Sequence, residues 1–146
     1  MKSPRFLFVP GVGEGVAAHP VWPDLHQPFE GETDGDGSWF AWRLTGANHR
    51  ELGRSSRVYP DLASARDAIV RLQAGIHAVD VAIVNPPCTG TWGWRLRVAG
   101  ESVATSSRSY SRYRECAYNA TAFLSATALA EIPDRAVTRG PPQRRP

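Results

Sequence analysis

The sequence predicts an α+β fold in which two tandem β-β-(β)-α-β repeats share one antiparallel sheet and pack two helices on one face. Three observations lead to this class. A tryptophan-arginine-leucine motif occurs twice, each time followed by a serine-rich run that ends in tyrosine. The residues around each motif alternate between apolar and polar, which is typical of a strand with one buried face. Apolar residues at helical spacing follow each serine-rich run.

The duplication rests on two matched pairs of segments. Residues 42–44, with the sequence Trp-Arg-Leu, recur at 94–96, and the pattern Ser-Ser-Arg-x-Tyr at 55–59 recurs at 106–110. The turn between them is one residue shorter in the second copy, and turns tolerate such changes. One copy alone would bury little apolar area, so two copies that continue a single sheet are expected to share one core.

Two further kinds of strand are predicted in each copy. The second strand of each copy is expected over Leu52–Tyr59 and Val103–Tyr110, where small and polar side chains suit a surface that contacts water or a ligand. Ala78–Val84 is rich in valine and isoleucine and precedes an Asn-Pro-Pro loop, so it is expected to return as another strand. The corresponding strand of the second copy is expected over Ala128–Ile132.

A helix is predicted in each copy between these strands. In the first, Asp61 can cap the N-terminus and Gly75 is placed to end the helix. In the second, Ser111 or Arg112 is expected to open the helix. Each helix presents an apolar face at helical spacing. The residues of these faces are Leu62, Ala65, Ile69 and Leu72 in the first copy and Tyr113, Cys116, Ala120 and Phe123 in the second.

Charge and composition divide the chain into four segments. Residues 1–37 are rich in glycine, proline and acidic side chains and are expected to be an irregular acidic leader, although Phe6–Val9 could pair as an extra strand. The two repeats are assigned to 38–87 and 88–132. Residues 133–146 carry four arginines and little apolar area, so they are expected to form a basic flexible tail.

Composition also limits the class of protein. The hydrophobic fraction of 42% is sufficient for a packed core, and no run of apolar residues is long enough to cross a membrane. The two cysteines, Cys88 and Cys116, have neither a metal-binding nor a disulfide-framework spacing. We therefore expect a cytoplasmic protein without a membrane segment.

The repeated motif resembles that of the YegP-like proteins, small bacterial proteins of unknown function built from one or two copies of a domain. The shared features are an aromatic strand, a turn with Asn or Gly, a Ser-rich run with Tyr, and a helix with set small and aliphatic positions. Members usually carry Glu where this chain has Arg57 and Arg108. The resemblance implies one antiparallel sheet with helices on one face, and it implies no activity. The matching residues are Trp42–Leu44, Asn48, Ser55–Tyr59, Ala65 and Ile69, then Trp94–Leu96, Gly100, Ser106–Tyr110, Cys116 and Ala120.

No catalytic, cofactor or metal site is predicted, and we expect the chain not to be an enzyme. The four histidines lack the close spacing of metal ligands. Cys116 lies on the apolar helix face and is interpreted as a core thiol. Cys88 follows two prolines in a loop, with no histidine near it in the sequence. We therefore expect no bound cofactor.

An arginine-bearing sheet face is the candidate binding surface. If Trp42 and Trp94 face the core, the arginines that alternate with them face the other way. Such a face suits phosphates held by guanidinium groups, and Trp39 is a candidate stacking platform. The residues assigned to this face are Arg43, Arg54, Arg57, Arg95, Arg97 and Arg108.

Two functions from different classes remain. We favour a non-enzymatic protein-interaction or structural module, in which an exposed sheet edge pairs with a partner protein or with a second copy as a homodimer. The alternative is a nucleic-acid-binding protein that uses the arginine- and serine-rich sheet face. Residues 38–133 carry eleven basic and seven acidic groups, and this net charge of +4 is small for nucleic-acid binding, which favours the first function.

Overall fold

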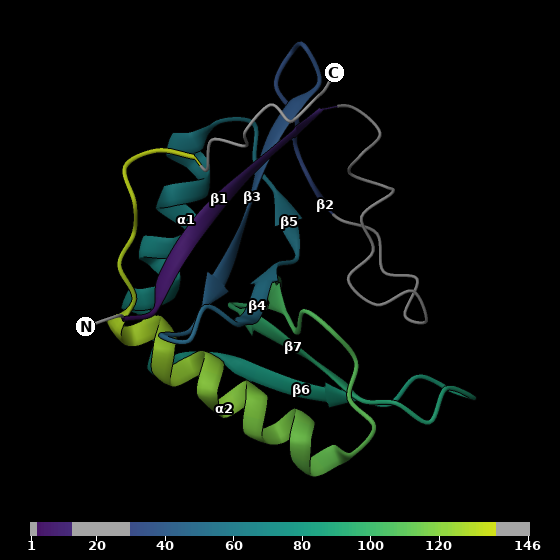
Figure 1. Cartoon of the computed structure of the whole chain (residues 1–146). Coiled ribbons are helices and arrows are strands. Elements are labelled where there is room, and N and C mark those ends of the chain that lie inside the picture. Colours follow the sequence, from purple (N-terminus) through teal and green to yellow (C-terminus); the bar gives the residue numbers. More distant parts are fainter. Residues whose placement is uncertain (1–2, 13–29, 137–146) are drawn as a thin grey trace, which may run out of the picture.

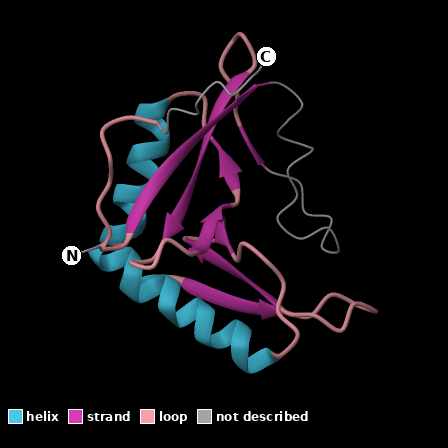
Figure 2. Ribbon diagram, viewed as in Figure 1, coloured by secondary structure: helices cyan, strands magenta, loops and turns pink. Residues whose placement is uncertain are grey.

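The computed structural model describes residues 3–12 and 30–136. A six-stranded antiparallel sheet carries two helices on one face, which confirms the predicted α+β class (Figure 2). Tandem duplication stays a prediction. In their order across the sheet, the strands are β1 (Arg5–Val12), β3 (Ser38–Thr45), β4 (Glu51–Ser55), β8 (Glu101–Thr105), β7 (Gly93–Val98) and β6 (Asp80–Val84). The helices are α1 (Leu62–Ala74) and α2 (Tyr113–Leu129), and Figure 1 labels both.

The first strand of the sheet comes from the segment that the sequence assigned to an irregular leader. Phe6 and Phe8 alternate with less buried residues and are fully buried in the core. β1 pairs with β3 from Arg5 to Val12. The segment Phe6–Val9 therefore does pair as an extra strand of the sheet. Residues 13–29 lie outside the described part of the chain, as do residues 137–146 of the predicted tail.

The prediction of a single strand over Leu52–Tyr59 is wrong in its length. It divides into β4 and the two-residue β5 (Arg57–Val58), which pairs in parallel with β2 (Glu30–Gly31). The break follows Ser55, whose buried hydroxyl donates to the carbonyl of Arg57 at 2.9 Å. The predicted strand over 103–110 divides in the same way: β8 ends at Thr105, and Tyr110 pairs alone with Trp92.

The first helix matches its predicted ends. Asp61 is the N-cap, with its carboxylate accepting the backbone N–H of Ser64 at 2.7 Å, and Gly75 is the C-cap. This cap supplies one acceptor for the unpaired N–H groups of the first turn. α2 begins after Arg112, which gives it no side-chain cap.

The strand predicted over Ala128–Ile132 does not form, because α2 continues to Leu129. Thr127 is buried at this end, and its hydroxyl donates to the carbonyl of Phe123 at 2.8 Å. Among the described residues beyond α2, Glu131 alone makes a bridge, to Arg5 at the start of β1.

The valine-rich segment before the proline loop is a strand, as predicted, although Ala78 belongs to a short 3-10 helix, η3 (Ile76–Ala78). This strand, β6, pairs with β7 and stands at one end of the sheet, opposite β1 (Figure 1). Asp80, Val81 and Ala82 are exposed. β6 is therefore the last strand on its side, with no strand beyond it within the described residues.

Aromatic rings from both halves of the sheet meet under the helices. Trp42 and Trp94 are fully buried, which confirms the predicted inward face. Phe123 of α2 lies between them, with its ring centre 6.3 Å from that of Trp42 and 4.7 Å from that of Trp94.

Neither α1 nor α2 combines the length and the apolar character that a bilayer crossing requires.

Candidate functional site

The sheet face opposite the helices, called the open face below, carries one row of residues that crosses all six strands. Strand register places them side by side because each is the cross-strand partner of the next. Three of the six are arginines. Arg43 and Arg95 face outward because each follows a buried tryptophan in its strand. The row is Leu7, Arg43, Arg54, Thr105, Arg95 and Ala82.

Glu51 forms ion pairs with two of these arginines. Its carboxylate oxygen Oε2 lies 2.7 Å from Nη2 and 2.8 Å from Nε of Arg54, and Oε1 lies 3.6 Å from Nη1 of Arg43. Ser107 donates its hydroxyl to the same carboxylate. Arg54 and Glu51 are about four-fifths buried, so this contact is screened less than a surface pair. Sequence reasoning missed Glu51, because the neighbours of a glutamate at the start of a hairpin strand depend on the register of the hairpin.

The second half of the face has no equivalent acid. Arg95 occupies the same place in its tryptophan motif as Arg43, but Ser102 of β8 stands where Glu51 stands in the first half. Arg95 and Arg97 make no ion pair with any residue that the structure describes. The Nε atoms of Arg43 and Arg95 are both buried without a hydrogen-bond partner in the described ranges. In one half of the open face the arginines thus form ion pairs, whereas Arg95 and Arg97 in the other half form none within the described residues.

The other two predicted arginines lie elsewhere. Arg57 lines a pocket of about 280 Å³ that includes Arg71 of α1 and Glu101 of β8. Arg108 lies beside α2, with its guanidinium carbon 4.9 Å from the ring centre of Tyr110. The structure therefore brings Arg43, Arg54, Arg95 and Arg97 to one face. It places Arg57 in a separate pocket and Arg108 in a groove that Arg54 also lines.

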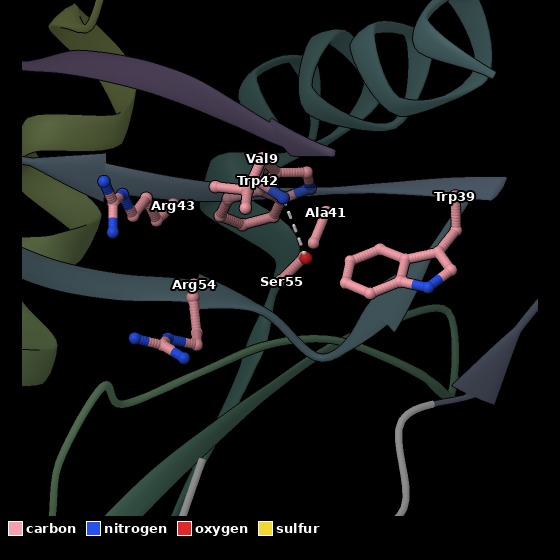
Figure 3. Close-up of a pocket in the computed structure, with 7 residues that line it drawn as sticks. All are labelled: Val9, Trp39, Ala41, Trp42, Arg43, Arg54 and Ser55. Carbon is pink, nitrogen blue, oxygen red and sulfur yellow. Dashed lines mark hydrogen bonds between the residues drawn. The ribbon is translucent and has the colours of Figure 1, made fainter. Parts of the chain in front are cut away.

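Trp39 does not provide the predicted stacking platform. Its side chain is 3% exposed, and it lines a cavity of about 80 Å³ on the open face, together with Arg43 and Arg54 (Figure 3). Gly11 of β1 lies against the indole so closely that a Cβ there would overlap the ring. The period of two correctly predicted the side of the sheet, but it could not predict that β1 would cover this ring.

A larger groove was missed by the sequence reasoning. It has a volume of about 1000 Å³ and lies between α2, the loop before α2 and the β3–β4 turn. Its lining includes Arg50 and Arg54 on one side and Arg108, Arg114 and Tyr118 on the other. The four-residue spacing of Arg114 and Tyr118 was the available signal, since it places them on one helix face. We call this the α2 groove.

The cysteines and histidines do not converge. Burial raises the pKa of the Cys116 thiol to about 11, so this group is protonated at neutral pH. Cys88 is exposed in the loop after β6. Among the residues described, no three His, Cys, Asp or Glu side chains are grouped to hold a metal ion. His19 and His26 lie outside the described residues.

Comparison with known proteins supports the architecture alone. No family model and no curated protein matches the chain. Among solved structures, the chain is similar to the solution structure of YegP from E. coli, a protein of unknown function, with a TM-score of 0.55 and 13% sequence identity. The similarity covers 76% of this chain and 95% of that chain. At this identity a shared fold carries no activity. The chain therefore has a YegP-like fold.

Proposed function

We propose that the chain is a non-enzymatic protein-interaction module that assembles through β6, with a second copy of the chain as its partner. The observation that carries the proposal is the exposure of this edge strand. Its residues Asp80, Val81 and Ala82 are exposed, and its outer backbone groups have no strand beside them within the described residues. Unpaired edges of this kind are templates for another strand.

The opposite edge is less available. The backbone N–H of Phe6 donates to the carbonyl of Glu131 at 2.9 Å, and the N–H of Glu131 donates to the carbonyl of Pro4 at 3.2 Å. These contacts occupy one end of β1. Within residues 3–12 and 30–136, no comparable contact covers β6, so it is the edge that favours assembly.

The sequence of β6 suits antiparallel pairing with itself around a two-fold axis. Centred on Ala82, such pairing would place Val81 against Ile83 and Asp80 against Val84 of the other copy. No two like charges would face each other. A five-residue edge buries less area than a standard stable interface, so the association is expected to be weak.

Charge substitutions at Ala82 test this arrangement. Ala82→Lys and Ala82→Glu each place two like charges opposite each other at the two-fold axis, so each variant should remain monomeric. A mixture of the two variants should associate again. The measurement is sedimentation equilibrium over a concentration series that reaches the millimolar range. Ala74→Lys, at an exposed position of α1, is the matched control and should associate like the wild type.

The outcomes separate the alternatives. A wild-type chain that stays monomeric throughout the series would contradict the proposal. Self-association that is unchanged in both Ala82 variants would place the interface elsewhere and would also overturn it. Restored association in the mixture supports pairing through β6.

Nucleic-acid binding on the open face is the second candidate. The observation that favours it is that Arg95 and Arg97 form no ion pair within the described residues. Two observations count against it. Glu51 forms ion pairs with Arg43 and Arg54, and Asp80 is the cross-strand partner of Arg97. The face therefore offers fewer available charges than its six predicted arginines suggest.

A further inference from the structure

The α2 groove gathers basic side chains from three separate elements. Arg50 comes from the β3–β4 turn, Arg108 from the loop before α2, and Arg114 from the first turns of α2. Arg50 and Arg114 are exposed, and neither makes an ion pair within residues 3–12 and 30–136. Glu115 is the acidic group that lines the groove apart from Glu51. An anionic ligand would therefore meet several charges that are not neutralised.

Two tyrosines line the same groove, and they have different roles. Tyr110 carries the guanidinium of Arg108 on its ring, which holds this charge at the groove wall. Burial raises the pKa of the Tyr110 hydroxyl, although Arg108 opposes the shift, so the ring is neutral at physiological pH. Tyr118 is 77% exposed. It lies one helical turn beyond Arg114, where a flat ring is accessible next to a positive charge.

The corresponding position in the other half provides an internal comparison. Arg57 and Tyr59 line a pocket there as Arg108 and Tyr110 line the α2 groove. The smaller pocket has Glu101 at the turn position that Arg50 occupies in the groove. In the aligned helices, Ala63 and Asp67 stand where α2 has Arg114 and Tyr118. The combination of basic and exposed aromatic side chains is therefore particular to the α2 groove.

We propose that the α2 groove binds single-stranded nucleic acid, with Arg50, Arg108 and Arg114 contacting phosphates and Tyr118 stacking on a base. Arginine forks match phosphate oxygens, and every base offers a ring face to an exposed aromatic side chain. An acidic peptide would use the arginines but would not require the exposed ring. An open groove of about 1000 Å³ suits a chain-like ligand. This proposal does not depend on pairing through β6.

The test is fluorescence anisotropy with labelled oligo-dT and oligo-U titrated with the full chain. Arg114→Ala combined with Tyr118→Ala should weaken binding at least about tenfold, because both a phosphate contact and a stacking contact are lost. Tyr118→Phe should keep the wild-type affinity, since it retains the ring. Arg71→Ala, in the smaller pocket, is the matched control and should also bind like the wild type.

Salt provides a second readout. Three phosphate contacts on a single strand predict a slope of about −2 for log affinity against log salt concentration. The slope should fall by about one third in Arg114→Ala alone. Circular dichroism melting checks that the variants fold, which is expected because both side chains are exposed.

Four results would overturn the proposal. The first is no oligonucleotide binding at low salt. The second is unchanged binding in the Arg114 and Tyr118 double variant, and the third is a loss of binding in Arg95→Ala with Arg97→Ala instead, which would move the site to the open face. The fourth is stronger binding of poly-glutamate than of the oligonucleotides, which would assign the groove to acidic protein segments.

Discussion

The hydroxyl oxygen of Ser55 accepts a hydrogen bond from the backbone N–H of Trp42 at 3.1 Å, in the buried centre of the sheet. The same arrangement recurs in the other half, where the hydroxyl oxygen of Ser106 accepts the backbone N–H of Trp94 at 3.3 Å. Each serine thus replaces a backbone partner at the point where its strand ends. These bonds explain why both serine-rich runs leave the sheet beside a tryptophan.

Ser55→Ala should destabilise the protein by about 1–3 kcal/mol, because it leaves the buried N–H of Trp42 without its acceptor. It also removes the bond to the carbonyl of Arg57. The free energy of unfolding is measured by urea denaturation. Ser125→Ala, at an exposed position of α2, is the control and should change stability by less than about 0.5 kcal/mol. Equal stability of the two variants would contradict the assigned role.

Gly53→Ala should destabilise the protein by about 1–3 kcal/mol through overpacking. A Cβ at Gly53 would lie 2.7 Å from a ring carbon of Phe123 and 2.8 Å from one of Trp94, and both rings are buried. Gly35→Ala has open space around the new Cβ and is the matched control. The two variants are compared by thermal unfolding. A midpoint for Gly53→Ala that equals the control would mean that the rings can move aside.

Local patterns in the sequence predicted much of the fold. Alternation around Trp42 identified both the strand and its buried side, because a period of two depends only on the pleat of the chain. The cap at Asp61 and the stop at Gly75 follow from the chemistry of helix ends, which involves neighbours within a few residues. The open face followed from the same alternation, so Arg43 and Arg95 were correctly oriented together.

Features that depend on distant partners could not be predicted in this way. Nothing near Phe6 in the sequence shows that it packs against Trp42, where the two ring centres are 5.3 Å apart. The cover over Trp39 and the contacts of Glu51 depend on strand order and on hairpin register. The α2 groove escaped prediction for the same reason, because Arg50 and Arg114 approach each other only after the sheet has formed.

Asp61→Asn should remove a specific part of the pH dependence of stability. The backbone N–H of Ser64 holds the pKa of the Asp61 carboxyl below its ordinary value. A lowered folded-state pKa stabilises the protein above the unfolded-state pKa, and this contribution is lost as the pH falls through the folded-state pKa. Asparagine caps the helix without titrating.

The measurement is the urea midpoint of both proteins between about pH 6 and about pH 3. The wild type should lose stability relative to Asp61→Asn as the pH falls. Asp36 also has a lowered pKa, owing to hydrogen bonds from Ser38, but it titrates in both proteins and cancels from the difference. Parallel curves for the two proteins would contradict the role of Asp61 as a charged cap.

The two cysteines should differ sharply in reactivity. Thiol reagents react with the thiolate, and burial raises the pKa of Cys116 to about 11, so its thiolate is scarce and inaccessible at pH 8. Cys88 is exposed in its loop. A disulfide reagent should therefore titrate one thiol rapidly in the native protein and the second only in urea, and Cys88→Ser should leave no rapidly reacting thiol. Rapid reaction of both thiols in the native wild type would mean that α2 separates from the sheet often enough to expose Cys116.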